Sequence, residues 1–242
     1  MGFGRGAVVM NGPVLVILAA GRARRFGGVK PLAPIGVHGE AVIDLIASDA
    51  YDAGFGHIVV VVNPDTGPLI REHIAANWPA DKSVAFAIQE RPLGTVHAVL
   101  SALPALDPTL PFGVCNADDL YGRDAMAALG RQLTSDGGNC LVAFRLDQAL
   151  VGDQPVTRGV CQVNDGTLTG IVERRQVTAT ASNYASADGL EPAALSADTL
   201  VSMNLWGFDA SMWDVFRDAM AAAEASEDAE VLLPEIVGEQ IR

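Results

Sequence analysis

Residues 14–32 read VLVILAAGRARRFGGVKPL, an apolar segment that runs directly into a glycine-containing loop rich in cations. The apolar part, Val14–Leu18, is typical of a parallel strand that is buried on both faces. Glycine allows the backbone of such a loop to approach a ligand closely. Within nine positions the loop also carries four cations: Arg22, Arg24, Arg25 and Lys30. Guanidinium and ammonium groups bind phosphate oxygens, so this stretch predicts a polyphosphate site.

A strand followed by a longer segment with helical periodicity recurs through the first 145 residues. Apolar or β-branched runs predict further strands at Ile58–Val62, Val84–Ile88, Phe112–Cys115 and Cys140–Arg145. The segments between the strands predict helices at Ala41–Ala53, Pro68–Asn77, Thr95–Leu103 and Arg123–Thr134. Such alternation indicates an α/β fold, with a mostly parallel sheet and helices on both of its faces.

The pattern changes after about residue 150. Gly159–Val163 and Leu168–Glu173 flank Asn164-Asp165-Gly166, which predicts a β-hairpin. The stretch Gln176–Asp198 is rich in Ala, Ser and Thr and has little periodicity. A segment of that length without secondary structure is typical of a lid or of disorder.

A last strand is expected at Leu200–Phe208, a helix near Ser211–Ala223 and a final short helix from Glu227 through Ile236. Trp206 and Trp213 are expected in the core. No linker is long enough to force a second domain. We therefore expect one domain over residues 1–242, with a nucleotide-binding half at about 10–150 and an acceptor-binding half at about 151–242.

Composition narrows the possible partners. The net charge is −13, from 16 basic and 29 acidic residues, which disfavours nucleic acid and anionic membranes as partners. The apolar stretch Pro13–Ala20 is shorter than the ~20 residues of a membrane helix, and Met1–Gly12 lacks the pattern of a secretory signal. Three widely spaced cysteines indicate reduced thiols rather than disulfides or zinc. We expect a cytoplasmic protein.

Polar clusters follow three of the predicted strands. They are the cationic loop, Gln89–Thr95 and Asn116–Gly122. Ligands of open parallel sheets bind at the carboxyl ends of the strands, so these clusters are expected to form one site. The loop after the first strand lacks both Gly-x-Gly-x-x-Gly and Gly-x-x-x-x-Gly-Lys-Ser/Thr, which disfavours a dinucleotide dehydrogenase and a P-loop ATPase.

Leu18-Ala19-Ala20-Gly21, followed by Arg25 and by Lys30-Pro31-Leu32, resembles the signature of the sugar-phosphate nucleotidyltransferases, or NDP-sugar pyrophosphorylases. The likeness continues in family order to about residue 210, through these elements: Gln89, Gly94-Thr95, Asp118, Val172-Glu173-Arg174 and Ser202–Phe208. It implies a Rossmann-like three-layer α/β/α sandwich of the GT-A-like type. It also implies an enzyme that joins a nucleoside triphosphate to a sugar 1-phosphate, giving an NDP-sugar and pyrophosphate.

The resemblance implies roles for particular residues. Arg25 and Lys30 would contact the triphosphate and the sugar phosphate, and Asp118 would hold Mg²⁺, so these three form the expected catalytic set. The nucleotide would contact residues of two segments, at the end of the first strand and after the third: Leu18, Ala19, Ala20, Gly21, Gln89, Gly94 and Thr95. The sugar phosphate would contact residues of the second half: Glu173, Arg174 and Asn204. Gln89 suits a pyrimidine edge, and Gly94 would leave room for the base.

Simpler roles stay open for some of these residues. Thr95 could cap the helix that follows it, and Asp118 and Asp119 could cap the helix that begins near Arg123. His97 could be a surface or partly buried histidine with no catalytic part.

The sequence also departs from the family signature. Ala23 replaces a glycine, Arg24 replaces a small hydroxyl residue, and Arg174 stands where lysine is more common. The family places a second metal-binding residue after the final helices, whereas this chain stops at Arg242. We therefore expect a truncated chain, a substitute such as Asp209, or impaired activity.

The implied mechanism is in-line attack of an acceptor phosphate on the α-phosphorus, which needs no general base because the phosphate is already ionised. Three rivals remain: the same fold with another acceptor such as phosphocholine, a glycosyltransferase, and a nucleotide-binding regulatory module without catalysis. A glycosyltransferase has no use for Arg25 and Lys30. The sequence leaves open the base, the acceptor and whether the chain forms a homo-oligomer.

Overall fold

The computed structural model describes residues 12–21, 28–135, 138–150, 152, 154–181, 183–226 and 230–241. Arg22, Arg24 and Arg25 of the cationic loop lie outside these described residues. The elements of the first half are β1 (Val14–Ala19), the 3-10 helix η1 (Lys30–Leu32), α1 (Val42–Asp52), β2 (His57–Val62), α2 (Gly67–Asn77), β3 (Val84–Ile88), α3 (Gly94–Ser101), the 3-10 helix η2 (Leu103–Ala105), β4 (Phe112–Asn116), α4 (Arg123–Leu133) and β5 (Cys140–Arg145). Those of the second half are α5 (Leu146–Ala149), β6 (Val156–Asn164), β7 (Thr167–Ala179), β8 (Tyr184–Ser186), β9 (Ala194–Leu195), β10 (Leu200–Phe208), α6 (Met212–Ser226) and α7 (Leu233–Gln240).

One sheet runs through the molecule in the order β3-β2-β1-β4-β10-β6-β7-β8-β9, and β5 pairs with β10. Strands β1 to β4 pair in parallel, so the loops that follow them emerge at one edge. β10 lies antiparallel to β4, and the strands beyond it continue with antiparallel pairing. The expected α/β fold is therefore confirmed, with parallel pairing confined to the first half.

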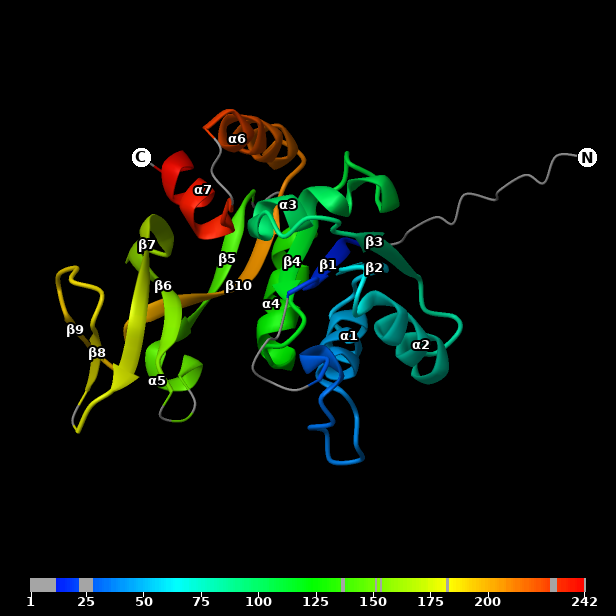
Figure 1. Ribbon diagram of the computed structural model, residues 1–242, viewed down its shortest axis with the longest axis horizontal. Coiled ribbons are helices and arrows are strands. Elements are labelled where there is room, and N and C mark those ends of the chain that lie inside the picture. Colours follow the sequence, from blue (N-terminus) through cyan, green and yellow to red (C-terminus); the bar gives the residue numbers. More distant parts are fainter. Residues whose placement is uncertain are drawn as a thin grey trace, which may run out of the picture.

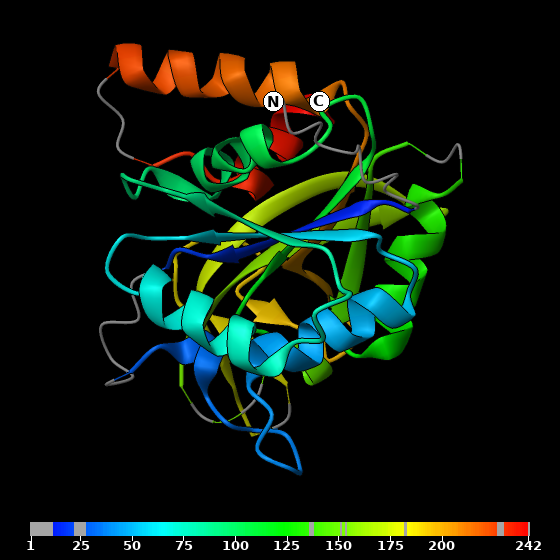
Figure 2. The same ribbon diagram turned by 90° about the vertical axis from the view of Figure 1, so that its right-hand side faces the viewer.

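Helices cover both faces of the parallel half (Figure 2). On β1, Leu15 and Ile17 face a core shared with α1, α2 and α4, whereas Val14 and Val16 face a core shared with α3, α6 and α7. Side chains of a strand alternate between its faces, so a strand packed on both sides must be apolar throughout. This explains the uninterrupted apolar run at the start of the quoted stretch.

The strands and helices expected in the first half are confirmed to within a few residues. The predicted helix Thr95–Leu103 ends at Ser101 and continues as η2, which has Pro104 in its first turn. The predicted start of the final helix, Glu227, lies outside the described residues, and the predicted continuous helix to Ile236 is wrong, because residues 230–232 are not helical and α7 begins at Leu233. Pro234 stands in the first turn of α7, where its missing N–H costs nothing.

The hairpin around Asp165-Gly166 is confirmed. Asn164 pairs with Thr167 across the turn, and Asp165 and Gly166 have φ of 48° and 77°. Two consecutive residues with positive φ are typical of the tight turn that joins right-twisted strands, and Asp-Gly supplies them at low cost.

The expectation of a lid or a disordered segment at Gln176–Asp198 is wrong. β7 continues to Ala179, and β8 and β9 extend the sheet into the wing that lies at its far end in Figure 1. A buried ion pair holds this wing together: Arg174, 3% exposed, donates from Nε and Nη2 to Asp188 at 2.8 and 3.0 Å. Arg174 also donates to the carbonyls of Leu190 and Pro192. These non-local bonds supply the order that the sequence pattern does not indicate.

Candidate functional site

A cavity of about 660 Å³ opens at the carboxyl ends of β1, β3 and β4. It is lined by Leu18, Ala20, Gly21, Gln89, Pro92, Gly94, Thr95, Ala98, Asn116, Asp118, Asn204, Glu230 and Leu232. Most residues expected to bind the nucleotide therefore lie together, as the parallel pairing of β1 to β4 requires. Ala19 is an exception among them, because its side chain is buried in the core against the α1 face of the sheet.

Lys30 and Asp118 meet at this cavity. Lys30 opens η1, and its Nζ lies 2.6 Å from Oδ2 of Asp118. The two side chains are 43% and 36% exposed, so both are accessible to a ligand. The structure thus brings together two of the three expected catalytic residues, and the third, Arg25, lies outside the described residues.

Asp118 and Asp119 differ in their surroundings. Asp119 accepts a hydrogen bond from Asn116 Nδ2 at 2.9 Å, and burial raises the pKa of Asp119. Asp118 instead faces the cavity. The alternative that these aspartates cap α4 is wrong, because α4 begins after Gly122 without a side-chain cap.

A hydrogen-bonded chain fixes the Asp118 loop to β10. The Asn116 N–H donates to Tyr121 Oη at 2.8 Å, and the Tyr121 hydroxyl donates to the Met203 carbonyl at 2.9 Å. Tyr121 is 7% exposed, and burial raises its pKa well above the ordinary value, so the hydroxyl keeps its proton. Tyr121 is not predicted from the sequence, where its only signal is an aromatic residue inside a polar loop.

The Gln89 amide is oriented by its partners. Its Nε2 donates to the Gly94 carbonyl at 3.0 Å and lies 3.1 Å from His97 Nδ1. A carbonyl only accepts, so the amide nitrogen must face Gly94. Among the described residues nothing donates to Gln89 Oε1, which leaves an acceptor for a ligand in the cavity.

Gly94 and Thr95 serve a different purpose from the one expected. The Val231 N–H donates to the Leu93 carbonyl, and the Val96 N–H donates to the Val231 carbonyl, each at 3.1 Å. Gly94 has φ of 90°, and a Cβ there would overlap the Val231 backbone. The space beside Gly94 therefore holds the chain itself rather than a base.

Thr95 Oγ1 accepts from the Leu233 N–H at 2.9 Å. It thus satisfies the start of α7, whereas α3 has no side-chain cap, so the expected N-cap role of Thr95 in its own helix is wrong. The segment 230–233, which we name the strap, also brings Glu230 and Leu232 into the cavity wall. The strap is not predicted from the sequence, because no local pattern marks it.

The expected sugar-phosphate residues separate in the structure. Glu173 lines a neighbouring cavity of about 560 Å³ between β7 and α7, with Arg175, Asp188, Glu235 and Glu239 among its other lining residues. Burial, with the nearby Glu173 carboxylate second, raises the pKa of Glu235.

The expectation that Arg174 contacts a phosphate is wrong. Its guanidinium is buried and makes four hydrogen bonds to Asp188, Leu190 and Pro192. Of the three expected residues, only Asn204 lies in the cavity that holds Asp118.

The donor set fits a hard divalent cation that shares its ligands with a substrate. Within the described part of the chain, no three His, Cys, Asp or Glu side chains form a ready cage. Mg²⁺ needs only one or two carboxylates when phosphate oxygens and water complete its shell. Asp118 supplies one such carboxylate, and its Oδ2 already contacts the Lys30 ammonium group. Asp209 lies away from Asp118, because Phe208 pairs with Phe112 at the start of β4 whereas Asp118 follows the end of that strand; Asp209 Oδ1 accepts from the Ser211 N–H and hydroxyl.

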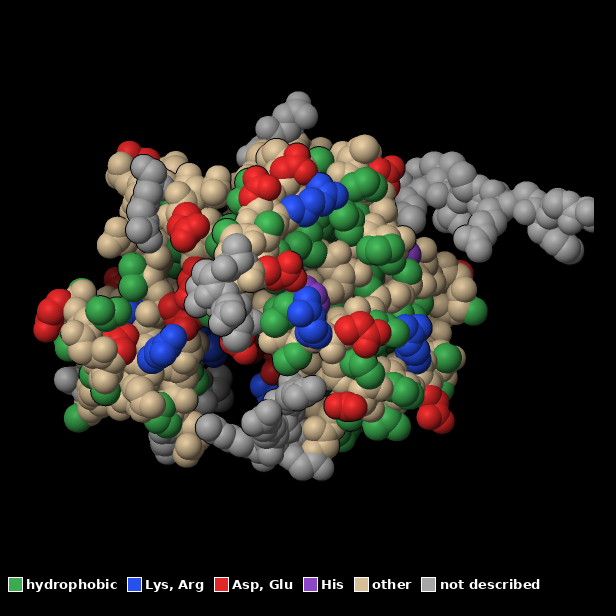
Figure 3. Space-filling model, turned by 45° about the horizontal axis from the view of Figure 1, so that its top comes forward, with side chains coloured by type: hydrophobic (Ala, Val, Ile, Leu, Met, Phe, Trp, Pro, Cys, Tyr) green, Lys and Arg blue, Asp and Glu red, His purple; other side chains and the backbone are tan. Residues whose placement is uncertain are grey.

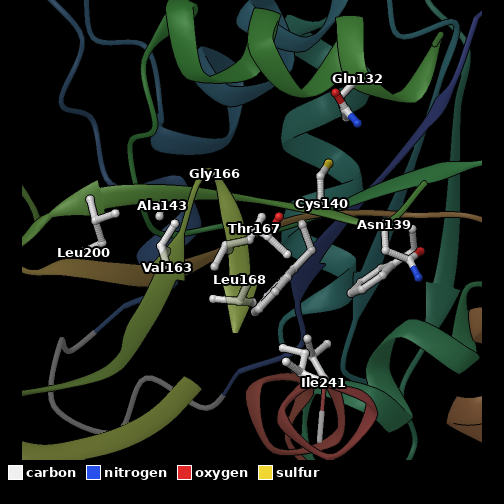
Figure 4. A pocket seen from close by; sticks show the side chains of 14 residues that line it. Gln132, Asn139, Cys140, Ala143, Val163, Gly166, Thr167, Leu168, Leu200 and Ile241 are labelled. Carbon is white, nitrogen blue, oxygen red and sulfur yellow. The ribbon is translucent and has the colours of Figure 1, made fainter. Parts of the chain in front are cut away.

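A second cavity, of about 610 Å³, lies along β5 and β10 beside the β6–β7 turn (Figure 4). Its lining, as far as the structure describes it, is mainly apolar and includes no charged side chain. Val163, Leu168 and Ile241 contribute to its wall, while Gln132, Asn139 and Thr167 supply its polar groups. A phosphate or a metal finds no counter-charge there, so the first cavity is the candidate site.

The described surface carries mixed charge on the face shown in Figure 3. Acidic and basic side chains are interspersed over the described part of the face shown in Figure 3, without a continuous basic stripe. Among the described residues, no helix combines the length and apolar composition needed to cross a membrane.

The sequence matches known proteins over most of its length. The sequence model of the MobA-like NTP transferase domain covers residues 15–228. The bifunctional protein GlmU of Paraburkholderia phytofirmans is 30% identical over 165 residues, which are 68% of this chain and 34% of that protein. GlmU of Burkholderia thailandensis is 29% identical over 200 residues, which are 82% of this chain and 39% of that protein. The chain therefore spans between a third and two fifths of the length of these relatives.

Solved structures share the fold. A UDP-glucose pyrophosphorylase complexed with UDP-glucose superposes with a TM-score of 0.62 and 13% identity, covering 95% of this chain and 86% of that chain. The inositol-1-phosphate CTP transferase from T. maritima gives a TM-score of 0.65 and 12% identity, covering 96% of this chain and 82% of that chain.

Proposed function

The chain belongs to the MobA-like NTP transferase domain family, and we propose that it transfers a nucleotidyl group from a nucleoside triphosphate to a sugar 1-phosphate, with Mg²⁺. The products are an NDP-sugar and pyrophosphate. One observation carries the proposal: Lys30 Nζ lies 2.6 Å from Asp118 Oδ2 beside the cavity at the carboxyl ends of β1 and β4. A reacting polyphosphate requires a cationic side chain and a carboxylate that can hold a metal close together.

The chemistry needs positioning and neutralisation of charge. An oxygen of the acceptor phosphate forms a bond to the α-phosphorus, and the bond from that phosphorus to the bridging oxygen breaks. Pyrophosphate leaves with the electron pair. Mg²⁺ held by Asp118 would supply positive charge to the phosphate oxygens, and Lys30 would donate to them. The acceptor is already ionised, so no residue has to act as a general base.

The nucleotide would lie in the cavity between Gly21 and Gln89. Because Gln89 Nε2 is occupied by Gly94 and His97, the side chain offers its oxygen to the base. That oxygen can accept from N3–H of uracil or the amino group of cytosine, and equally from the amino group of adenine or N1–H of guanine. A pyrimidine donor therefore stays a prediction from the family resemblance, and comparison of the four nucleoside triphosphates tests it.

The acceptor would extend toward β7, where Glu173 can accept hydrogen bonds from sugar hydroxyls. One observation favours a second candidate, an acceptor with a cationic group such as phosphocholine. The cavity next to Glu173 also contains Glu235 and Glu239, and among the described residues that line it Arg175 is the one basic side chain. Carboxylates stabilise an ammonium group as readily as they bind hydroxyls.

The test is pyrophosphate release. The protein is incubated with Mg²⁺, each of the four nucleoside triphosphates, and a panel that contains several sugar 1-phosphates and phosphocholine. We expect release only when triphosphate and acceptor are both present, and none after chelation of the metal. Release without an acceptor would contradict the proposal. Triphosphate binding without release for any acceptor would identify a nucleotide-binding regulatory module instead.

A further inference from the structure

β10 is interrupted where it passes the candidate site. Its pairing with β5 shifts between Ser202 and Trp206, and Asn204 has φ of 61°. The Asn204 N–H donates to Ser202 Oγ at 3.1 Å, and the Tyr121 hydroxyl holds the Met203 carbonyl. Asparagine tolerates positive φ better than most residues, and bulges of this kind redirect side chains next to active sites.

The bulge directs Asn204 to a buried tryptophan. Trp206 is 1% exposed, and its Nε1 donates to Asn204 Oδ1 at 3.1 Å. An indole N–H is only a donor, so the atom that faces it must be the amide oxygen. The hydrogen bond therefore fixes the orientation of the Asn204 amide, with its NH₂ group turned away from Trp206.

The Asn204 NH₂ group is available to a ligand. Asn204 lines the same cavity as Asn116 and Asp118. Among the described residues, none accepts a hydrogen bond from Asn204 Nδ2. Two N–H donors beside a carboxylate suit an oxygen of a phosphate or a hydroxyl.

Sheet order indicates which substrate supplies that oxygen. Gln89, which would meet the base, follows β3, whereas Asn204 lies on β10, between β4 and the hairpin that carries Glu173. Asn204 is therefore on the acceptor side of Asp118.

We propose that Trp206 is a positioning residue, which fixes the Asn204 amide so that its NH₂ group donates to an oxygen of the phosphate acceptor. This inference rests on the transferase function proposed above. It assigns to a buried tryptophan a part in acceptor recognition beyond its packing.

The chain offers a matched control. Trp213 is 2% exposed and belongs to the same hydrophobic core as Trp206. Within the described residues its Nε1 has no hydrogen-bond partner. Trp206→Phe and Trp213→Phe each remove an indole N–H and keep an aromatic ring, but only the first releases Asn204.

We expect Trp206→Phe to raise KM for the acceptor by about 5- to 30-fold, the range for one lost orienting hydrogen bond, and to leave KM for the triphosphate within about 2-fold. Trp213→Phe should change neither KM. Asn204→Asp keeps an oxygen for Trp206 and the positive φ, but replaces the donors with an anionic oxygen. It should raise KM for the acceptor at least as much as Trp206→Phe does, while the nitrogen-15 indole signal of Trp206 keeps its hydrogen-bonded position.

Equal changes in the acceptor KM for Trp206→Phe and Trp213→Phe would overturn the inference, because the effect would then be loss of packing. Equal changes in the two KM values of Trp206→Phe would also overturn it. Thermal unfolding of each variant is measured as well, to check that the assays use folded protein.

The inference can be tested separately from the transferase function. If no substrate pair releases pyrophosphate, nitrogen-15 spectra with α-D-glucose 1-phosphate and with phosphocholine test it directly. Movement of the Asn204 side-chain amide signals in the wild type, lost in Trp206→Phe, supports the positioning role. Signals that stay still, or that move equally in both proteins, overturn it.

Discussion

Lys30 Nζ and Asp118 Oδ2 lie 2.6 Å apart, although the two residues are 88 positions apart in the chain. β1 and β4 are parallel neighbours, so the loops that follow them meet at one edge of the sheet. The contact places an ammonium group on the carboxylate that we expect to hold the metal. In the proposed mechanism, Lys30 and a divalent cation would therefore compete for Asp118 until a polyphosphate binds to both.

Lys30→Met tests this competition. Without nucleotide, Mn²⁺ should bind the variant up to about 5-fold more tightly, because an exposed ion pair contributes at most about 1 kcal/mol. KM for the triphosphate should rise about 10- to 100-fold, since a charge-assisted hydrogen bond to phosphate is lost. Metal binding is measured by electron paramagnetic resonance. Lys82→Met, at the chain's other lysine, is the control and should change neither quantity. Unchanged kinetics in Lys30→Met would indicate that the cationic loop is a solvated turn that does not bind the triphosphate.

Asp118→Asn should reduce metal-dependent turnover by about 100-fold or more, because the amide removes the negative charge that holds Mg²⁺. Folding should be intact, since Asp118 is partly exposed and does not cap α4. Pyrophosphate release and Mn²⁺ binding measure the effect. Asp124→Asn, at an exposed position in the first turn of α4, serves as the control. A fully active Asp118→Asn protein would refute the metal assignment.

The fold was largely readable from periodicity. Strands such as β1 and β2 are buried on both faces, so their apolar runs are continuous, and amphipathic helices separate them. The ordered structure of the wing was not predicted, for a physical reason. Its order comes from Arg174 and Asp188, which pair across 14 positions, and not from a repeating pattern of apolar residues.

The candidate site was predictable where it depends on strand ends. Asp118 follows β4 and Gly21 follows β1, and parallel pairing alone brings their loops together. It was not predictable where it depends on distant backbone. Thr95 and Leu233 are 138 positions apart, and no local signal links them. Trp206 is buried in the core, as expected, and the hydrogen bond from its indole to Asn204 is not visible in the sequence.

The orientation of Gln89 should depend on pH through His97. Burial first, and the Arg91 cation second, lower the pKa of His97 below its ordinary value of 6.5. An unfolded chain therefore takes up this proton before the folded chain does. The resulting contribution to stability is present above pH 6.5 and declines as the pH falls below it. Once His97 is protonated, its Nδ1 can no longer accept from Gln89.

His97→Asn keeps an acceptor but has no titrating proton. We expect KM of the wild type for the triphosphate to rise between about pH 7 and pH 5, and that of His97→Asn to stay nearly constant. Steady-state kinetics over this range measure the effect. His38→Asn, at an exposed histidine, should retain the wild-type pH profile. An identical profile in His97→Asn would exclude a role of His97 in orienting Gln89.

Arg174→Lys separates a structural role of Arg174 from phosphate binding. Lysine cannot donate to Asp188, Leu190 and Pro192 in the same geometry, so the variant should unfold at a Tm several degrees lower. Hydrogen bonding from Arg174 holds the pKa of Asp188 well below its ordinary 3.8. This stabilisation is therefore present above that pH, and it is lost as the pH falls through the lowered pKa.

Thermal unfolding and limited proteolysis of the wing measure the effect of Arg174→Lys. Arg175→Lys is the control, because the Arg175 side chain is 70% exposed and contacts Glu173 at 3.6 Å. A stable Arg174→Lys protein with a raised KM for the acceptor would instead indicate that Arg174 binds the acceptor phosphate.

Gly94→Ala should displace the strap at residues 230–233. A Cβ at Gly94 would lie 2.6 Å from the Val231 nitrogen and would overlap the Val231 carbonyl, so one backbone must move. The hydrogen bonds between Val231 and the 93–96 turn would break, and Leu232 would leave the cavity wall. We expect a loss of stability greater than the roughly 1–2 kcal/mol of positive φ alone, and higher KM values for both substrates.

Gly39→Ala isolates the conformational part of this effect. Gly39 has φ of 91°, like the 90° of Gly94, but apart from its chain neighbours no atom of the described residues lies within 4 Å of the Cβ it would gain. Denaturant unfolding of the two variants gives the cost of the steric clash as their difference. If both lose the same stability, the strap tolerates the added methyl group. The Val231 backbone would then not be what requires glycine at position 94, and the space beside Gly94 would again be open to a nucleotide base.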